Sequence, residues 1–474
     1  MKKKLNKNAL FMVVTLLVLS CASLVSAVPA IPEYALEIHD AATVVDTHND
    51  TVRRVIDRST WLPVNNIGDY LDNAQLDIPK MQDGGLDVAF FGSYTSGYIE
   101  PDRANSRLLA LINALHWTES MNKENFGLAT SVKEIERLVH EGKSAGVPTI
   151  EGAYSLEEYN AIELLKQYHD LGIRVVGLCW SNSNSLGEGV NERYKDGTPS
   201  EGGLTELGLA VVKEMNRLGM IVDISHMNEE TFWDVIEAAE APVMASHSNV
   251  WELYNHVRNL KDEQIIALAN TGGIVQQNFY AGYLGPVGDR DLKKLVDHID
   301  YIVNLVGVDH AGLGSDFDGG GMPVDLPNAS FYYRLTEELV AREYKKSDIE
   351  KILGKNTLRV MKEVQNLAEK SPTNVGEGIT IIPAFEMGDG FDSWFPLLTA
   401  QVQRNTGSHI DESSFRVIVD GIVYTPEYDS ETDILSLQIT ETLLEKFHVV
   451  TFEGANHNGT ITRETRIFYI QDQE

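Results

Sequence analysis

The sequence predicts an α/β protein in which a (β/α)8 barrel of the TIM type is followed by a small all-β domain. Three observations predict this architecture. Eight short apolar runs each end in polar residues, and amphipathic stretches separate them. The pattern changes near residue 370 to short segments in which apolar and polar residues alternate. The length of 474 residues leaves room for one large domain and one smaller domain.

The chain begins with a segment typical of a secretory signal peptide. Four lysines precede an apolar stretch at 10–19, and Val25-Ser26-Ala27 is a cleavage site made of small residues. We therefore predict a signal peptide over 1–27 and a secreted or extracytoplasmic protein. A lipid anchor at Cys21, which would attach the protein to the cell surface, is the less favoured alternative.

Composition excludes several classes of partner. The formal net charge of −31 argues against nucleic acid and against anionic membranes. Hydrophobic content of 43% and charged content of 23% are typical of a globular protein. Cleavage after Ala27 would leave Cys179 as the single cysteine, so we expect no internal disulfide and a small core residue at this position.

The apolar runs and the stretches between them predict the barrel, over residues 33–368. Apolar residues recur at helical spacing in the intervening stretches, as at Leu108, Ile112 and Leu115, or at Leu292, Leu295 and Ile299. Strands that alternate with helices form parallel sheets with right-handed crossovers, and eight such units close a barrel. The eight runs are 41–50, 86–94, 147–155, 173–181, 220–228, 241–249, 272–280 and 311–319.

A linker at 369–380, which contains proline, asparagine and glycine, is predicted to end the barrel. Beyond it, period-two alternation at 415–420, 434–439, 448–452 and 463–470 predicts short strands separated by turns. We expect an immunoglobulin-like β-sandwich over 381–474, without the paired cysteines of antibody domains. This segment carries no catalytic cluster, so we interpret it as a stabilising or adhesive accessory domain, whose ligand is unknown.

Candidate site residues follow from the polar side chains that end the runs. Active sites of parallel barrels lie at the carboxyl ends of the strands. His48 and Asp50 share one face of the first strand because residues i and i+2 point the same way. Three imidazoles and three carboxylates at one barrel mouth suit divalent metal, and this number of ligands favours two ions with one bridging carboxylate. The six residues are His48, Asp50, Glu151, His226, His247 and Asp316.

The chain resembles the membrane (renal) dipeptidases, which are dinuclear zinc hydrolases of the amidohydrolase superfamily. The resemblance covers roughly residues 33–368 and leaves the C-terminal segment outside. The matching stretches occur in family order: Asp46-Thr47-His48-Asn49-Asp50, Gln75-Leu76-Asp77-Ile78-Pro79, Glu151-Gly152, Asp223-Ile224-Ser225-His226, Ala245-Ser246-His247-Ser248, His256-Val257-Arg258-Asn259-Leu260, Asn278-Phe279-Tyr280 and Ser315-Asp316-Phe317-Asp318-Gly319.

The resemblance implies two zinc ions and a dipeptide substrate. His48 and Asp50 would bind one zinc ion, His226 and His247 the other, and Glu151 would bridge both. A hydroxide bridging the metals would attack the scissile carbonyl.

The resemblance also implies roles around the metals. Asp316 would transfer the proton to the leaving amine. Arg258 would bind the C-terminal carboxylate of the dipeptide, although a surface ion pair is an alternative. Tyr280 would line the pocket, and a core aromatic is an equal alternative.

One position departs from the family pattern. Many members have a histidine after the fourth strand that contacts the oxyanion, and Trp180 stands there in this chain. An indole N–H can donate one hydrogen bond but carries no charge. Asn182 or Asn184 could compensate for the lost charge. The substitution bears on rate or substrate range and leaves the metal ligands intact.

The sequence leaves other functions open beside a secreted zinc dipeptidase. One is a related dinuclear hydrolase that acts on another small amide, a lactone or a modified cell-wall dipeptide. Another is a non-catalytic surface protein on the same scaffold. The family often forms dimers, so a homodimer is possible, but the sequence carries no interface signature.

Overall fold

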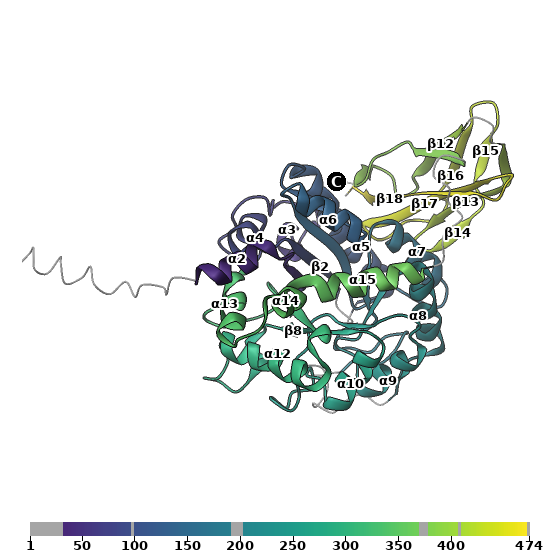
Figure 1. Cartoon of the computed structure of the whole chain (residues 1–474). Helices are drawn as coiled ribbons and strands as arrows, with labels where there is room; N and C mark the ends of the chain where they lie inside the picture. The colour runs from purple at the N-terminus through teal and green to yellow at the C-terminus, as the bar shows by residue number, and fades with distance from the viewer. Residues whose placement is uncertain (1–31, 96–98, 191–201, 369–377, 406–408, 472–474) are drawn as a thin grey trace, which may run out of the picture.

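The computed structural model describes residues 32–95, 99–190, 202–368, 378–405 and 409–471. The predicted signal peptide, Cys21 and most of the predicted linker lie outside these ranges. All eight predicted barrel strands form, and each lies within its predicted run except the third of the eight, which begins three residues early (Figure 1). These strands are β1 (Val45–Asn49), β2 (Val88–Tyr94), β4 (Ser144–Glu151), β5 (Val175–Gly177), β6 (Ile221–Asp223), β7 (Met244–Ala245), β8 (Ile274–Asn278) and β9 (Ala311–Gly314).

The strands form one parallel sheet in chain order from β1 to β9. One short strand that the sequence analysis missed, β3 (Phe126–Leu128), pairs with β4 off this path. The first and last strands meet through a parallel bridge between Asn49 and Phe317. There the Asp50 N–H donates to the Phe317 carbonyl at 2.7 Å, and the Asp316 N–H donates to the His48 carbonyl at 2.9 Å. The sheet is therefore a nearly closed barrel, consistent with a TIM barrel.

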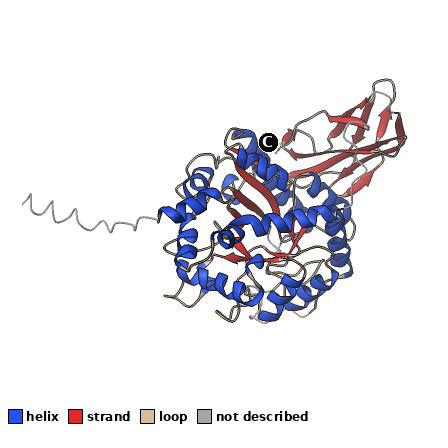
Figure 2. Cartoon of the chain, viewed as in Figure 1, coloured by secondary structure: helices blue, strands red, loops and turns tan. Residues whose placement is uncertain are grey.

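Helices surround the strands (Figure 2). In α12 the predicted stripe of Leu292, Leu295 and Ile299 is buried, and Asp291 caps the helix by accepting from the Lys294 N–H at 2.9 Å. The helices are α2 (Glu33–Ala41), α3 (Val52–Val55), α4 (Ile78–Gly84), α5 (Pro101–Met121), α6 (Val132–His140), α7 (Ala161–Asp170), α8 (Glu206–Leu218), α9 (Glu229–Ala238), α10 (Asp262–Asn270), α11 (Ala281–Leu284), α12 (Leu292–Val306), α13 (Tyr333–Ala341), α14 (Lys346–Glu350) and α15 (Asn356–Leu367), with short 3-10 or π turns at Val308–His310, Ala329–Phe331 and Lys351–Lys355.

Within the described ranges, no helix combines the length and apolar character that crossing a membrane requires. Cys179 is buried and unpaired, as expected for a core residue.

The C-terminal residues form two β-sheets that share one hydrophobic core (Figure 1). Pairing within them is antiparallel except between β11 and β18. The four predicted strands are present, and five further strands were missed. The sheets contain β10 (Ile379–Pro383), β12 (Leu397–Arg404), β16 (Ile434–Gln438) and β15 (Glu427–Asp429) in one, and β11 (Asp389–Phe391), β18 (Ile461–Ile470), β17 (Phe447–Asn456), β13 (Ile410–Val419) and β14 (Ile422–Tyr424) in the other.

The C-terminal sheets contact α5 and α7 of the barrel. Gln167 on α7 is fully buried at this contact. Its amide nitrogen donates to the Ile418 carbonyl and to the Thr451 hydroxyl, both at 3.0 Å, and its amide oxygen accepts from the Gly421 N–H at 2.8 Å. Asp170 at the end of α7 accepts from Arg463 at 2.9 Å. These bonds fix the sheets to the outer wall of the barrel.

Candidate metal centre and substrate pocket

The six predicted residues come together at the carboxyl ends of the barrel strands. His48 lies in β1 and Glu151 ends β4, while the other residues follow the ends of β1, β6, β7 and β9. All are buried except Asp316, which is partly exposed. His226 and Asp316 have positive φ angles of 71° and 64°, which non-glycine residues rarely adopt. The backbone therefore turns sharply at two of the site residues.

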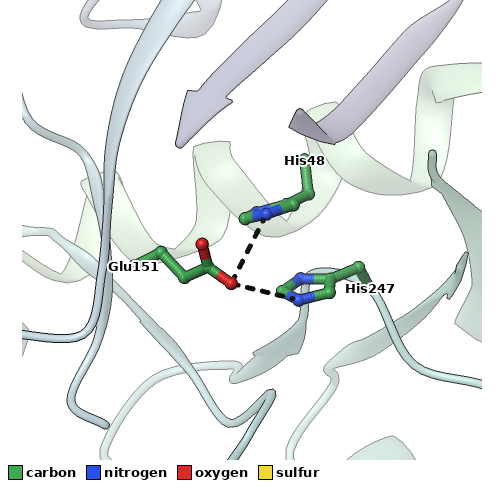
Figure 3. A group of neighbouring side chains, drawn as sticks. All are labelled: His48, Glu151 and His247. Atoms are coloured by element: carbon green, nitrogen blue, oxygen red, sulfur yellow. Dashed lines mark ion pairs between the residues drawn. The ribbon is translucent and has the colours of Figure 1, made fainter. Parts of the chain in front are cut away.

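Glu151 is the common neighbour of the three imidazoles. Its Oε1 lies 3.7 Å from His48 Nε2, 3.0 Å from His226 Nε2 and 3.6 Å from His247 Nε2. Figure 3 shows His48 and His247 on one side of the carboxylate, with dashed lines to the same oxygen. The two rings stack with centroids 3.8 Å apart. One carboxylate oxygen therefore faces three imidazole nitrogens, as a bridging ligand would.

Asp50 and Asp316 form a second group of candidate ligands around His48. Ligand atoms of His48, Asp50 and Asp316 all lie within 4.8 Å of one another, as do those of His48, Glu151 and His247. His48 Nε2 and Asp50 Oδ1 are buried without a hydrogen-bond partner. Buried polar atoms normally have partners, so these two atoms lack a group that would bind them. The donor set of imidazole nitrogens and carboxylate oxygens fits a divalent metal.

Burial controls the charge of the cluster. It lowers the pKa of His48 to about 3 and that of His247 well below its usual value, so both rings are neutral, the form that binds metal. Burial raises the pKa of Asp50 to about 6. It raises the pKa of Glu151 well above its usual value, and the charges of Asp50 and Asp316 raise it further. A bound cation would relieve this crowding of carboxylates.

Hydrogen bonds through Ser246 to Asp223 orient the candidate ligand His247. The Ser246 hydroxyl donates to Asp223 Oδ2 at 2.5 Å and lies 2.7 Å from His247 Nδ1. Because the hydroxyl proton goes to Asp223, the Nδ1–H of His247 donates to the hydroxyl oxygen. The lone pair of Nε2 is then directed toward Glu151, which is the tautomer that a metal ligand requires.

A cavity of about 200 Å³ opens beside the cluster, and it contains two of the three predicted substrate-binding residues. This volume is below the ~300–1,000 Å³ usual for drug-sized ligands, so it suits a small substrate. Tyr280 and Trp180 line it, and both are partly exposed, so Tyr280 is not a core aromatic. The lining residues are Asp50, Arg53, Tyr94, Glu151, Trp180, His226, Tyr280, Tyr283, Asp316 and Gly319.

Arg258 lies behind His247 and is only 3% exposed, so the alternative of a surface ion pair is wrong. Its Nη2 donates to the His247 carbonyl at 3.2 Å, and its guanidinium carbon lies 5.6 Å from the centroid of the Tyr283 ring. Its Nε is buried without a hydrogen-bond partner. The side chain is therefore a buried cation next to the cluster that retains capacity for an anion.

Several neighbours of the site were not predicted as functional residues. Asn278 donates to Asp316 Oδ2 at 3.0 Å. Asp46 accepts from the Ser315 N–H at 2.7 Å, and burial raises the pKa of Asp46 to about 7. Tyr94 ends β2, so the rule that selected the other strand ends would have found it. Arg53 comes three residues after Asp50 and carries no comparable signal in the sequence.

Comparisons with known proteins agree on one family. The sequence model of the membrane dipeptidases, peptidase family M19, matches residues 33–375. The dipeptidase aclJ of Aspergillus oryzae is 32% identical over 324 residues, which are 66% of this chain and 75% of the relative. A Klebsiella pneumoniae relative, described as an uncharacterized protein in the pqqA 5′ region, is 39% identical over 242 residues, which are 50% of this chain and 88% of the relative.

A similar solved structure is also that of a metallo peptidase. A metallo peptidase from Rhodobacter sphaeroides, crystallised with a phosphinate mimic of the dipeptide L-Ala-D-Ala, matches with a TM-score of 0.62 at 27% identity. The match covers 68% of this chain and 99% of that structure.

Proposed function

Because this chain belongs to the membrane dipeptidase family M19 and is therefore a metallo-dipeptidase, we propose that it is a secreted zinc enzyme that hydrolyses the peptide bond of free dipeptides. The observation that carries the proposal is the convergence of three imidazole Nε2 atoms on one oxygen of Glu151 beside a small cavity. The Rhodobacter sphaeroides protein binds a mimic of L-Ala-D-Ala, which supports dipeptides with D-residues at the second position as substrates of this enzyme as well.

We propose two zinc sites that share Glu151. His48 and Asp50 would hold one ion, and His226 and His247 the other. The unpartnered His48 Nε2 and Asp50 Oδ1 and the neutral state of His48 support the first site. Zinc ions bound there would supply hydroxide from water at neutral pH and would polarise the scissile carbonyl.

Asp316 is the proposed proton carrier. It would accept the proton that water loses when it attacks the carbonyl carbon, and return this proton to the amine nitrogen as the C–N bond breaks. Burial, followed by the charge of Asp50, raises the pKa of Asp316 to about 7. Asn278 binds one oxygen of Asp316 and so orients the carboxyl group.

Three residues are proposed to bind substrate. Arg258 would bind the C-terminal carboxylate through its planar guanidinium, because its Nε has no other partner. Trp180 would donate its indole N–H to the oxyanion, and its ring lies 5.5 Å from that of His226. Tyr280 would contact the substrate as part of the cavity wall.

Metal content per chain, measured with dipeptide turnover, tests the proposal. We expect about two zinc ions per chain by elemental analysis and hydrolysis of Ala-Ala and of L-Ala-D-Ala. A chelator should abolish turnover, and added zinc should restore it. Full turnover by metal-free protein, or metal-loaded protein that hydrolyses lactones but no dipeptide, would contradict the proposal.

We also propose the organisation of the whole chain: a signal peptide at 1–27, a catalytic barrel at 33–368, a linker at 369–380 and an immunoglobulin-like accessory domain at 381–474. The shared core of the two C-terminal sheets supports a sandwich, although β10 begins at Ile379, inside the proposed linker. N-terminal sequencing of the mature protein tests the cleavage site. Sedimentation equilibrium tests the homodimer.

A further inference from the structure

Arg53 places a cation in the cavity wall, close enough to Asp50 for its charge to lower the pKa of that carboxyl group. Its guanidinium carbon lies 5.2 Å from the centroid of the Tyr94 ring, and its side chain is partly exposed. Among the described residues, its guanidinium has no hydrogen bond and no ion pair. The adjacent Arg54 differs, because its Nε donates to Asp318 Oδ1 at 3.1 Å. Arg54 is therefore structural, whereas Arg53 is available to a ligand.

A row of aromatic rings that begins with Tyr94 links Arg53 to the candidate metal cluster. The Tyr94 ring lies 5.0 Å from that of Trp180, and the Trp180 ring lies 5.5 Å from that of His226. Arg53 therefore lies at the outer end of a row of rings that reaches a proposed metal ligand. Arg258 packs against a different ring, Tyr283, so the two arginines define separate positions for anions.

We propose that Arg53, packed over Tyr94, forms a side-chain subsite that selects dipeptides with an acidic residue, aspartate or glutamate. The inference rests on the proposed dipeptidase function and specifies its substrate class. A guanidinium that packs on a ring keeps N–H groups that can bind a carboxylate bidentately. Partial burial in the cavity strengthens this interaction over that at an open surface.

The acidic character of the whole protein makes a local cation favourable for binding an acidic substrate. A net charge of −31 repels anions at long range, and salt screens that repulsion beyond roughly 8–10 Å. The carboxylates of Asp50, Glu151 and Asp316 also line the cavity, and the proposed metal ions would offset their charge. A local cation next to the bound side chain would overcome this background and would favour glutamate over neutral glutamine.

The test compares glutamate with glutamine in the zinc-loaded enzyme. The substrates are Glu-Ala, Gln-Ala, Ala-Glu and Ala-Gln, with Ala-Ala as the reference. We expect the wild type to have a higher kcat/KM for glutamate than for glutamine at one of the two positions. In Arg53→Gln this ratio should fall by about 10- to 100-fold, mainly through KM, which is the size of one charge-assisted hydrogen bond.

Two further variants sharpen the result. Arg53→Glu should reverse the preference in favour of a lysine-containing dipeptide. The control is Arg58→Gln, which removes the same charge from an exposed residue outside the cavity and should leave the ratio unchanged.

Different outcomes overturn different claims. Equal rates for glutamate and glutamine in the wild type, or an unchanged ratio in Arg53→Gln, would overturn the subsite. If Arg53→Gln lost activity equally toward all substrates and bound less zinc, the function of Arg53 would instead be to support Asp50. Absence of turnover for every dipeptide, Ala-Ala included, would overturn the proposed function itself.

Discussion

The barrel mouth and the C-terminal sheets both bury histidine beside aspartate, yet they satisfy these groups differently. At the mouth, His48 Nε2 and Asp50 Oδ1 have no hydrogen-bond partner. In the C-terminal sheets, His448 Nδ1 lies 2.6 Å from Asp420 Oδ2, and its Nε2 lies 2.8 Å from the Glu445 carbonyl. Both ring nitrogens of His448 are thus satisfied within the protein. The same residue types form a candidate metal site in one region and a structural contact in the other.

Residue type and burial alone therefore do not separate the candidate metal site from the structural contact, whereas the unpartnered atoms of His48 and Asp50 do. Of the described residues after 378, one buried side-chain polar atom, Arg463 Nη2, lacks a partner, and other nitrogens of that arginine bind Asp170 and Glu453. Completely paired groups have no capacity left for a ligand. Substitutions in the two regions should therefore affect different measurements.

The largest effect is expected for Glu151→Gln. Loss of the proposed bridging carboxylate should lower zinc content and reduce kcat/KM for Ala-Ala by about 10³-fold or more. The matched control is Glu453→Gln in the C-terminal sheets, where Glu453 pairs with Arg463. That variant should retain zinc and turnover. Equal losses in the two variants would remove the distinction between the regions.

Asp316→Asn separates proton transfer from metal binding. We expect kcat for Ala-Ala to fall by about 10²- to 10⁴-fold, the usual contribution of a general acid–base group. Zinc content should remain close to that of the wild type. Parallel loss of zinc, measured by elemental analysis, would instead assign Asp316 to the metal ligands.

Gln167→Ala tests the contact between barrel and sheets. The substitution leaves the Gly421 N–H and the Ile418 carbonyl without their partner at a buried interface. We expect the free energy of unfolding in urea to fall by roughly 1–3 kcal/mol. Lys166→Ala, on the same helix but partly exposed, is the control. An unchanged denaturation midpoint for Gln167→Ala would show that this contact contributes nothing to stability.

The smallest effect concerns the pH dependence of stability through His448. Burial lowers the pKa of His448, but the charge of Asp420 and the hydrogen bonds outweigh it, so the pKa is raised. A raised histidine pKa adds stability below the unfolded value of about 6.5, and this stability is lost as pH rises through the folded value. The difference in stability between wild type and His448→Gln should therefore be larger at pH 5 than at pH 8. A difference that grows with pH would contradict this sign.

The strand ends were predictable because a buried parallel strand is a continuous apolar run, and the residue types that follow it are visible in the sequence. That rule found His48, Glu151 and His247 together. It missed β3, β11, β14 and β15 because strands of three residues show too few alternations to detect. This reason does not apply to the longer β10 and β12. The role of Arg53 could not be predicted, because the direction of a helical side chain relative to a cavity depends on distant elements. Tyr94, which ends β2, and Trp180, which follows β5, contribute to that wall.

The pairing of the first and last barrel strands constrains when the enzyme can take up its metal. His48 and Asp50 are translated early, whereas His247 and the segment that closes the ring at Phe317 emerge much later. A nascent chain that stops before residue 247 carries an incomplete set of ligands and an open sheet edge. A complete candidate metal site and a closed sheet therefore require synthesis of the chain through Phe317.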